Sequence, residues 1–115
     1  MELIETNNTT GLFFPQHEFE LLDKNMKVCR LMAMEVIKGV ELDLTVITNP
    51  EYQGNGYASL GVKMLIQWAI NNGYKKVALT NLSNSRAIDK IAEKLCFKKD
   101  GNNSWTKSII GPLNL

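Results

Sequence analysis

Hydrophobic and polar residues alternate with a period of two through three runs in the first half of the chain. The runs are FELL (19–22), MKVCRLMAMEVI (26–37) and VELDLTVIT (40–48), separated by the short polar segments DKN and KG. Such alternation, rich in β-branched residues, is typical of half-buried strands, and short turns join neighbouring strands antiparallel. The pattern therefore predicts an antiparallel meander. We expect residues 1–17, which precede it, to be irregular or to form one short strand.

The period becomes helical after Tyr57. Apolar residues recur three and four apart from Ala58 to Ile70, ahead of the stop signal NNG, and again from Ala87 to Leu95. This spacing predicts two amphipathic helices. Between them, KKVALT (75–80) is expected to be a buried strand. FKK and SWTKSII, on either side of DGNNS, are expected to form a C-terminal hairpin.

A meander followed by strand, helix, strand and helix defines an α/β fold with a mixed sheet. The helix that connects 40–48 to 75–80 implies a right-handed crossover, so these two strands should run parallel. The chain has no internal repeat and no low-complexity tract. We therefore expect one domain over residues 1–115.

Composition narrows the range of partners. The 115 residues are 44% hydrophobic and 22% charged, with a net charge of +1, so charge favours neither nucleic acid nor a membrane surface as partner. No apolar run is long enough to cross a bilayer, and the start lacks the pattern of a signal peptide.

Cys29 and Cys96 are expected to be free thiols in a cytoplasmic setting. A single histidine, His17, argues against a metal site.

The segment NPEYQGNGYASL (49–60) places two glycines in a loop between the third strand and the first helix. Gly54 and Gly56 permit positive φ and close approach of a ligand, and a helix N-terminus offers unpaired N–H groups to an anion. The alternative is an ordinary strand-to-helix turn. The segment has neither the P-loop pattern nor the dinucleotide-binding pattern, in which Ser59 would be glycine or alanine.

Gln53-Gly54-Asn55-Gly56-Tyr57-Ala58 resembles the Q/R-x-x-G-x-G/A signature of the GNAT superfamily of acetyl-CoA-dependent N-acetyltransferases. The segment NSRAIDKIAEKLCF (84–97) resembles that family's second signature helix, which commonly ends in EKLGF. The similarity extends over about residues 18–108, with the motifs in the expected order. It implies acetyl-CoA as cosubstrate, with no metal.

The resemblance also implies roles for individual residues. Loop amides would hold the coenzyme A pyrophosphate, the bend after the central strand would face the pantetheine and thioester, and the start of the second helix would flank them. These residues are Gln53, Gly54, Asn55, Gly56, Tyr57 and Ala58 in the loop, Val46, Ile47 and Thr48 on the strand, and Asn84 and Arg86 at the helix.

Transfer of an acetyl group to an amine needs a base for the amine proton and a donor for the developing oxyanion. Glu41 and Asp43 are candidate general bases, because alternation places both on the face opposite Leu42 and Leu44; two solvated strand carboxylates are the alternative. Ala92 stands where many family members have a tyrosine that protonates the leaving thiolate, and Cys96 stands where glycine is usual.

Sequence alone leaves two functions open. The first is an N-acetyltransferase that acts by direct attack in a ternary complex, with a small-molecule or peptide amine as acceptor. The alternative is a non-catalytic GNAT-fold module for coenzyme A binding or protein interaction. The short segment before Glu18 leaves the acceptor cleft open or completed by a partner subunit, so a homodimer is one expected arrangement.

Overall fold

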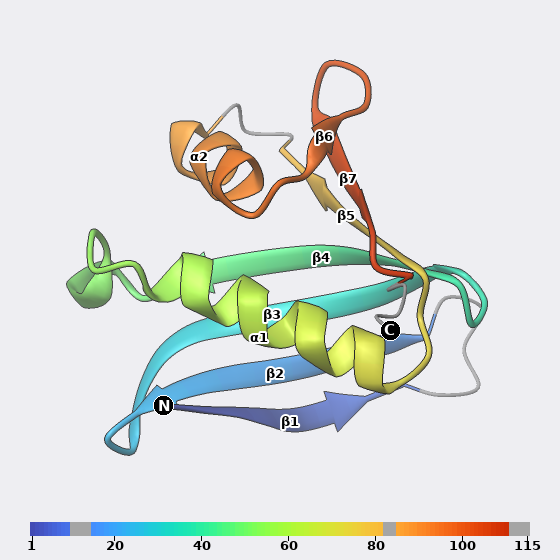
Figure 1. Cartoon of the computed structure of the whole chain (residues 1–115). Helices are drawn as coiled ribbons and strands as arrows, with labels where there is room; N and C mark the ends of the chain where they lie inside the picture. The colour runs from blue at the N-terminus through green and yellow to red at the C-terminus, as the bar shows by residue number, and fades with distance from the viewer. Residues whose placement is uncertain (10–14, 82–84, 111–115) are drawn as a thin grey trace.

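The computed structural model describes residues 1–9, 15–81 and 85–110. Its framework is a seven-stranded sheet in the order β1-β2-β3-β4-β5-β7-β6 (Figure 1). The strands are β1 (Glu2–Asn8), β2 (Gln16–Asp23), β3 (Met26–Ile37), β4 (Glu41–Thr48), β5 (Lys76–Thr80), β6 (Lys98–Lys99) and β7 (Ser104–Ser108). β1 to β4 pair antiparallel in sequence order, and β6 and β7 form the closing hairpin. The mixed sheet and its meander confirm the fold class expected from the sequence.

The turns of the meander follow from local sequence. Lys24 and Asn25 join β2 to β3 with φ of 51° and 68°. Two consecutive residues with positive φ are typical of the two-residue turns that match the twist of a β-hairpin. Asparagine tolerates the left-handed conformation that such a turn requires. Gly39, with φ of 71°, serves the β3–β4 turn. A bulge between Glu5 and Asn7 interrupts the edge strand β1.

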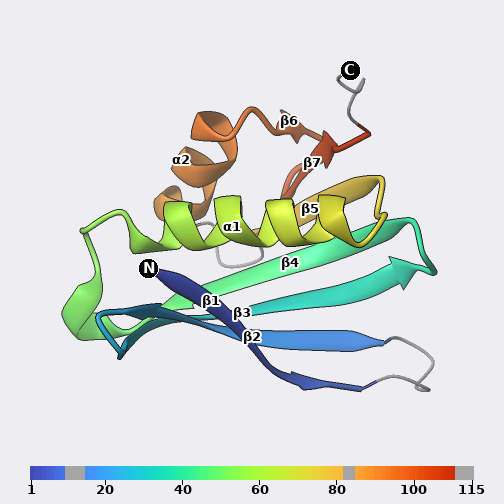
Figure 2. The ribbon, with the colours of Figure 1, turned by 60° about the horizontal axis from the view of Figure 1, so that its bottom comes forward.

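Two helices lie on the same side of the sheet, α1 (Tyr57–Asn71) and α2 (Arg86–Lys94), as Figure 2 shows. Helix α1 packs on β3 and β4 through a buried face that includes Val62, Leu65 and Ala69. Gly61 allows the close approach, because a Cβ there would lie 3.2 Å from the Leu31 Cδ2 atom. The opposite face of β1–β4 carries no helix within the described ranges (Figure 2). Neither helix has the length and apolar character needed to span a membrane.

The central strands β4 and β5 are parallel, as the crossover rule predicts. Their pairing runs from Glu41 opposite Lys76 to Leu44 opposite Leu79. β4 continues to Thr48 without a β5 partner in the described residues, while it stays paired with β3 as far as Cys29. The sheet therefore opens between β4 and β5 just beyond Leu44, and the loop to α1 begins at the end of the free stretch of β4.

Candidate active site

A groove with a volume of about 690 Å³ lies at this opening. Its walls come from the end of β4, the loop that leads into α1, the first turn of α1, and α2 (Figure 1). The lining residues are Val46, Ile47, Thr48, Tyr52, Gln53, Gly54, Gly56, Tyr57, Ala58, Ser59, Ser85, Ala87, Ile88, Lys90 and Ile91. The groove is thus apolar along β4 and α2 and polar at the start of α1, which suits an elongated ligand with an apolar arm and an anionic part.

The loop presents free backbone donors at the polar end of the groove. It consists of the 3₁₀ turn η1 (Pro50–Tyr52) and the exposed residues 53–56, and Gly54 and Gly56 have φ of 83° and 80°. Gly56 occupies the N-cap of α1, where no side chain caps the helix. The first N–H groups of a helix lack intrahelical partners, and an anion is their natural acceptor. A Cβ at either glycine would meet no protein atom within 4 Å.

Ser59 adds a side-chain donor at the same place. It lies in the first turn of α1 and lines the groove, and its buried Oγ has no hydrogen-bond partner among the residues that the structure describes. Buried hydroxyl groups are usually hydrogen-bonded, and an oxygen atom of a ligand in the groove is one acceptor that this hydroxyl could reach. Lys90 lines the groove from α2 and supplies a positive charge. The donor set therefore fits a phosphate-bearing ligand such as coenzyme A.

The α2 wall is held by a buried asparagine that sequence analysis did not single out. Asn81, 4% exposed, accepts from the Ser85 N–H at 2.8 Å and donates to the Ser85 carbonyl at 2.8 Å and to Asp89 Oδ1 at 3.1 Å. Trp105 Nε1 donates to the same Asp89 oxygen at 2.9 Å. The bonds from Trp105 and Asn81 lower the pKa of Asp89. This network fixes the start of α2 against β5 and β7.

The two candidate bases differ in their surroundings. Glu41 lies at the start of β4, where its Oε1 is 3.8 Å from Lys76 Nζ. Asp43 lies nearer the opening, and its Oδ1 accepts a hydrogen bond from Thr80 Oγ1 at 3.1 Å. Burial raises the pKa of Asp43 above its ordinary value, with a smaller contribution from the charge of Glu41, and the Thr80 bond only partly offsets this. Leu42 and Leu44 are buried on the helix side, so both carboxylates lie on the sheet face without a helix.

Most of the predicted cofactor residues that the structure describes line the groove. Val46, Ile47, Thr48, Gln53, Gly54, Gly56, Tyr57 and Ala58 all line it. Asn55 and Arg86 are exposed and are not among the lining residues. Asn84 lies outside the described residues. The sequence did not identify Ser59 as a cofactor residue, because it lies one residue beyond the glycine signature. Only its position directly after that signature could have indicated it.

Tyr57 and Tyr74, two of the three phenols of the chain, donate to carboxylates outside the groove. Tyr57 OH donates to Asp23 Oδ2 at 2.6 Å, and Tyr74 OH donates to Glu35 Oε2 at 2.9 Å. Burial, with the Glu35 bond, raises the pKa of Tyr74 to about 12. Ala92 is fully buried, and Cys96 is exposed with φ of 64°, the conformation that glycine usually supplies after a helix. Within the described ranges, no three His, Cys, Asp or Glu side chains gather as a metal site would require.

The family is established by comparison with known proteins. A model described as the acetyltransferase (GNAT) family matches residues 35–95, which include β4, the glycine loop, α1 and α2. The chain belongs to the GNAT family of acetyltransferases, which use acetyl-CoA. No curated protein matches the sequence.

Solved structures agree on the fold. The structure is similar to a spermidine/spermine N-acetyltransferase from Vibrio cholerae, with a TM-score of 0.77, 15% identity, and coverage of 86% of this chain and 70% of that one. It is similar to an aminoglycoside 6′-N-acetyltransferase complexed with coenzyme A, with a TM-score of 0.67, 17% identity, and coverage of 83% and 73%. A domain from Methanocaldococcus jannaschii has a TM-score of 0.71, 19% identity, and coverage of 82% and 67%.

Proposed function

We propose that this chain is an N-acetyltransferase that moves the acetyl group of acetyl-CoA directly to a primary amine in a ternary complex. The observation that carries the proposal is the groove at the β4–β5 opening. It combines an uncapped helix N-terminus, an unpartnered hydroxyl on Ser59 and an apolar arm toward a carboxylate-bearing strand. Because the chain belongs to the GNAT family, which uses acetyl-CoA, we interpret this combination as the site for acetyl-CoA.

The proposed placement of the cofactor follows the chemistry of the lining. The N–H groups of residues 54–58, with Ser59 Oγ, bind the pyrophosphate, while the Gln53 N–H donates to the Pro50 carbonyl at 3.4 Å. Lys90 adds charge from the α2 wall. The apolar walls from β4 and α2, including Val46 and Ile88, take the pantetheine arm. Backbone groups at the free end of β4 then meet the thioester, because no β5 strand occupies them.

In the reaction, the neutral amine attacks the thioester carbonyl carbon, a C–N bond forms, and the C–S bond breaks with release of the coenzyme A thiolate. A main-chain amide near Thr48 donates to the developing oxyanion. Asp43 takes the amine proton, directly or through water. Thiols ionise near pH 8.5, so the thiolate can leave without the tyrosine that Ala92 replaces.

Asp43 is a better candidate base than Glu41 on three observations. It lies next to the last β4–β5 pair, it has a raised pKa, and Thr80 holds one of its oxygens in place. A raised pKa makes a carboxylate a stronger base. Glu41 lies at the start of β4, farther from the opening, and its Oε1 is 3.8 Å from Lys76 Nζ.

The acceptor class is a primary amine on a small molecule or peptide. The similar structures include enzymes named for spermidine, spermine and aminoglycosides, all of which carry amines. The sheet face without a helix presents Asp43 on β4, and Glu18 and Glu20 lie on β2, two strands away. Arg30 and Lys27 of the intervening strand β3 lie 3.9 Å from Glu18 and 3.5 Å from Glu20. Carboxylates on this face suit an approaching ammonium group before it loses its proton.

The test combines binding with turnover. Calorimetric titration with coenzyme A measures the groove directly, and release of free thiol from acetyl-CoA with a panel of polyamines, aminoglycosides and peptides measures transfer. Asp43→Asn should lower kcat by about 10²- to 10⁴-fold with an unchanged KM for acetyl-CoA, whereas the matched Glu41→Gln should stay near wild type. Absence of coenzyme A binding at millimolar concentration would refute the proposal. Binding without transfer to any amine would instead support the non-catalytic module.

A further inference from the structure

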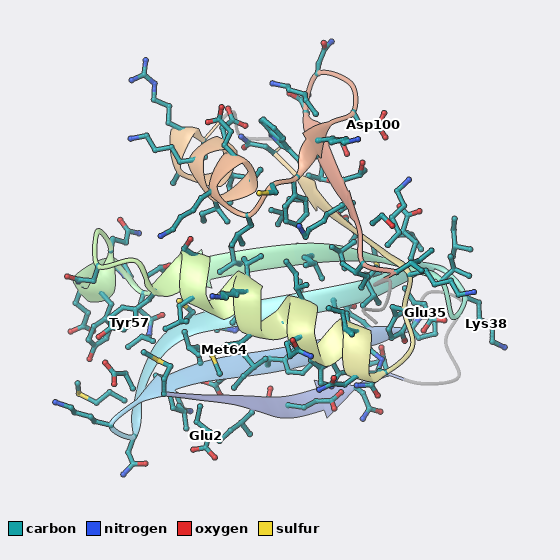
Figure 3. All side chains as sticks on the ribbon, viewed as in Figure 1. Glu2, Glu35, Lys38, Tyr57, Met64 and Asp100 are labelled. Carbon is teal, nitrogen blue, oxygen red and sulfur yellow. The ribbon has the colours of Figure 1, made fainter. Side chains whose placement is uncertain are left out.

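The tip of the β2–β3 hairpin contacts the glycine loop, although the two are far apart in sequence. Tyr57, the first residue of α1, donates its hydroxyl to Asp23 Oδ2 at 2.6 Å. Asp23 ends β2 immediately before the tight turn at Lys24 and Asn25. In Figure 2 the tip of the β2–β3 hairpin and the loop that leads into α1 lie at the same end of the sheet, and Figure 3 labels Tyr57 at the start of α1. The bond therefore ties the first turn of the helix to a rigid hairpin.

Further contacts join the same two segments. Asn49 donates its N–H to the Val28 carbonyl at 3.0 Å and its side-chain Nδ2 to the Lys27 carbonyl at 2.6 Å. Tyr52 OH lies 3.5 Å from Met26 Sδ. The rings of Tyr52 and Tyr57 meet edge to face, with centroids 6.1 Å apart and an interplanar angle of 79°. The loop is thus anchored before and after its exposed glycine segment.

The exposed segment forms hydrogen bonds within the loop itself: Asn55 Nδ2 donates to the Tyr52 carbonyl at 3.2 Å, and the Gln53 N–H donates to the Pro50 carbonyl at 3.4 Å. Residues 53–56 are all exposed, and two of them are glycines, which lose more conformational freedom than other residues when they become ordered. A ligand that binds an unfixed loop must order it, which weakens binding. Anchors at both ends hold the loop in one conformation before the ligand arrives. Tyr57 matters most, since it is itself the first helical residue.

We propose that the Tyr57 side chain and Asp23 are positioning residues for the cofactor, because their hydrogen bond fixes the direction of the first N–H groups of α1. This inference rests on the proposed function, since it assumes that the pyrophosphate binds at that turn. Neither side chain touches the reacting atoms. The Asp23 carboxylate, as acceptor, raises the pKa of Tyr57, as a carboxylate that accepts from a phenol should.

A matched control exists at the other end of α1. Tyr74 OH donates to Glu35 Oε2 at 2.9 Å, so it forms the same kind of tyrosine–carboxylate bond close to the end of the helix. Figure 3 shows Tyr57 and Glu35 at opposite ends of α1. Tyr57→Phe and Tyr74→Phe each remove one hydroxyl and keep the ring. A general loss of stability affects both variants, whereas a positioning effect on the cofactor is confined to Tyr57→Phe.

The experiment measures the Kd of coenzyme A by calorimetry, and KM and kcat with acetyl-CoA, for wild type and both variants. Tyr57→Phe should raise Kd and KM about two- to tenfold with little change in kcat, as expected for loss of one hydrogen bond. Tyr74→Phe should bind as wild type does. Asp23→Asn, which keeps an acceptor oxygen, should bind coenzyme A more tightly than Asp23→Ala does. In the double variant, Asp23→Ala should raise Kd little beyond the effect of Tyr57→Phe alone, because the hydrogen bond is already lost.

The outcomes separate this inference from the proposed function. If wild type binds coenzyme A and Tyr57→Phe binds equally well, the positioning role is wrong and the proposed function stands. Equal weakening by Tyr57→Phe and Tyr74→Phe also overturns the positioning role, because the effect would then be general. If wild type itself does not bind coenzyme A, the proposed function fails and this inference fails with it.

Discussion

Replacement of Gly56 by alanine tests the anion site most directly. Gly56 forms the N-cap of α1 with φ of 80° and ψ of 7°, in the left-handed region. An added Cβ would meet no protein atom within 4 Å, so the cost to folding is backbone strain without a clash. The same Cβ takes space beside the loop in the groove, where a bound phosphate must approach the backbone closely. The substitution should therefore weaken binding more than it weakens the fold.

Typical energies give the expected loss of folding stability and the expected loss of affinity. A residue with a side chain in this conformation costs about 1–2 kcal/mol. At about 2.1 cal/mol/K per residue, a chain of 115 residues has an unfolding entropy of about 0.24 kcal/mol/K, so the midpoint should fall by about 4–8 °C. Loss of one charge-assisted hydrogen bond to phosphate costs about 1.5–3 kcal/mol, or roughly ten- to a hundredfold in Kd.

Thermal unfolding with and without acetyl-CoA measures both effects. At 100 times the wild-type Kd, the ligand stabilises wild type by about 2.7 kcal/mol, or about 11 °C. A tenfold weaker variant gains only about 1.4 kcal/mol, or about 6 °C. Gly73→Ala is the matched control, since Gly73 follows α1 with φ of 83° and open space around its Cβ position. Equal ligand shifts for both variants would show that the loop at Gly56 does not bind acetyl-CoA.

Three other predictions follow from buried groups. Asp43→Asn should stabilise the protein at neutral pH. Burial raises the pKa of Asp43 in the folded protein above 3.8, so the contribution of this carboxyl to the free energy of unfolding is fully present below that pH. The contribution is lost as the pH rises through the folded-state pKa, and the substitution removes this loss. Urea unfolding at neutral pH measures the difference, and a wild type as stable as the variant or more stable would contradict the prediction. Asn81→Ala should cost about 1–3 kcal/mol, since the Ser85 N–H loses its acceptor. An unchanged urea midpoint would show that Asn81 does not fix the start of α2. Gly61→Val should cost about 1–3 kcal/mol by crowding Leu31, and wild-type stability would show that α1 can shift outward.

The sequence predicted the fold well where one period dominates a segment. Alternation over 26–37 and 40–48 matches β3 and β4 closely, because one face of each strand is buried and the other is not. The helical period from Tyr57 likewise found α1. The first strand, Glu2–Asn8, was harder to anticipate. It is an edge strand that is exposed over most of its length, so burial leaves little pattern in its residues.

The candidate site was predictable only where its parts are contiguous in sequence. The glycine loop is one segment, and its turn chemistry and helix start are written in adjacent residues. The Asp23–Tyr57 bond joins residues 34 positions apart, and the Asn81–Asp89–Trp105 network joins two elements that meet only after folding. Such contacts depend on tertiary packing, which a single sequence does not encode in any local period.

The opening between β4 and β5 explains how two substrates would reach one point from different sides. Both helices cover the same face of the sheet, and the groove that they help to line lies on that face. Asp43 lies on the opposite face, beside the last β4–β5 pair. Where β4 continues beyond Leu44 without β5, the sheet no longer separates the two faces. On the proposed function, the thioester therefore reaches the opening from the helix side and the amine from the uncovered side, so the uncovered face is the entry for the acceptor.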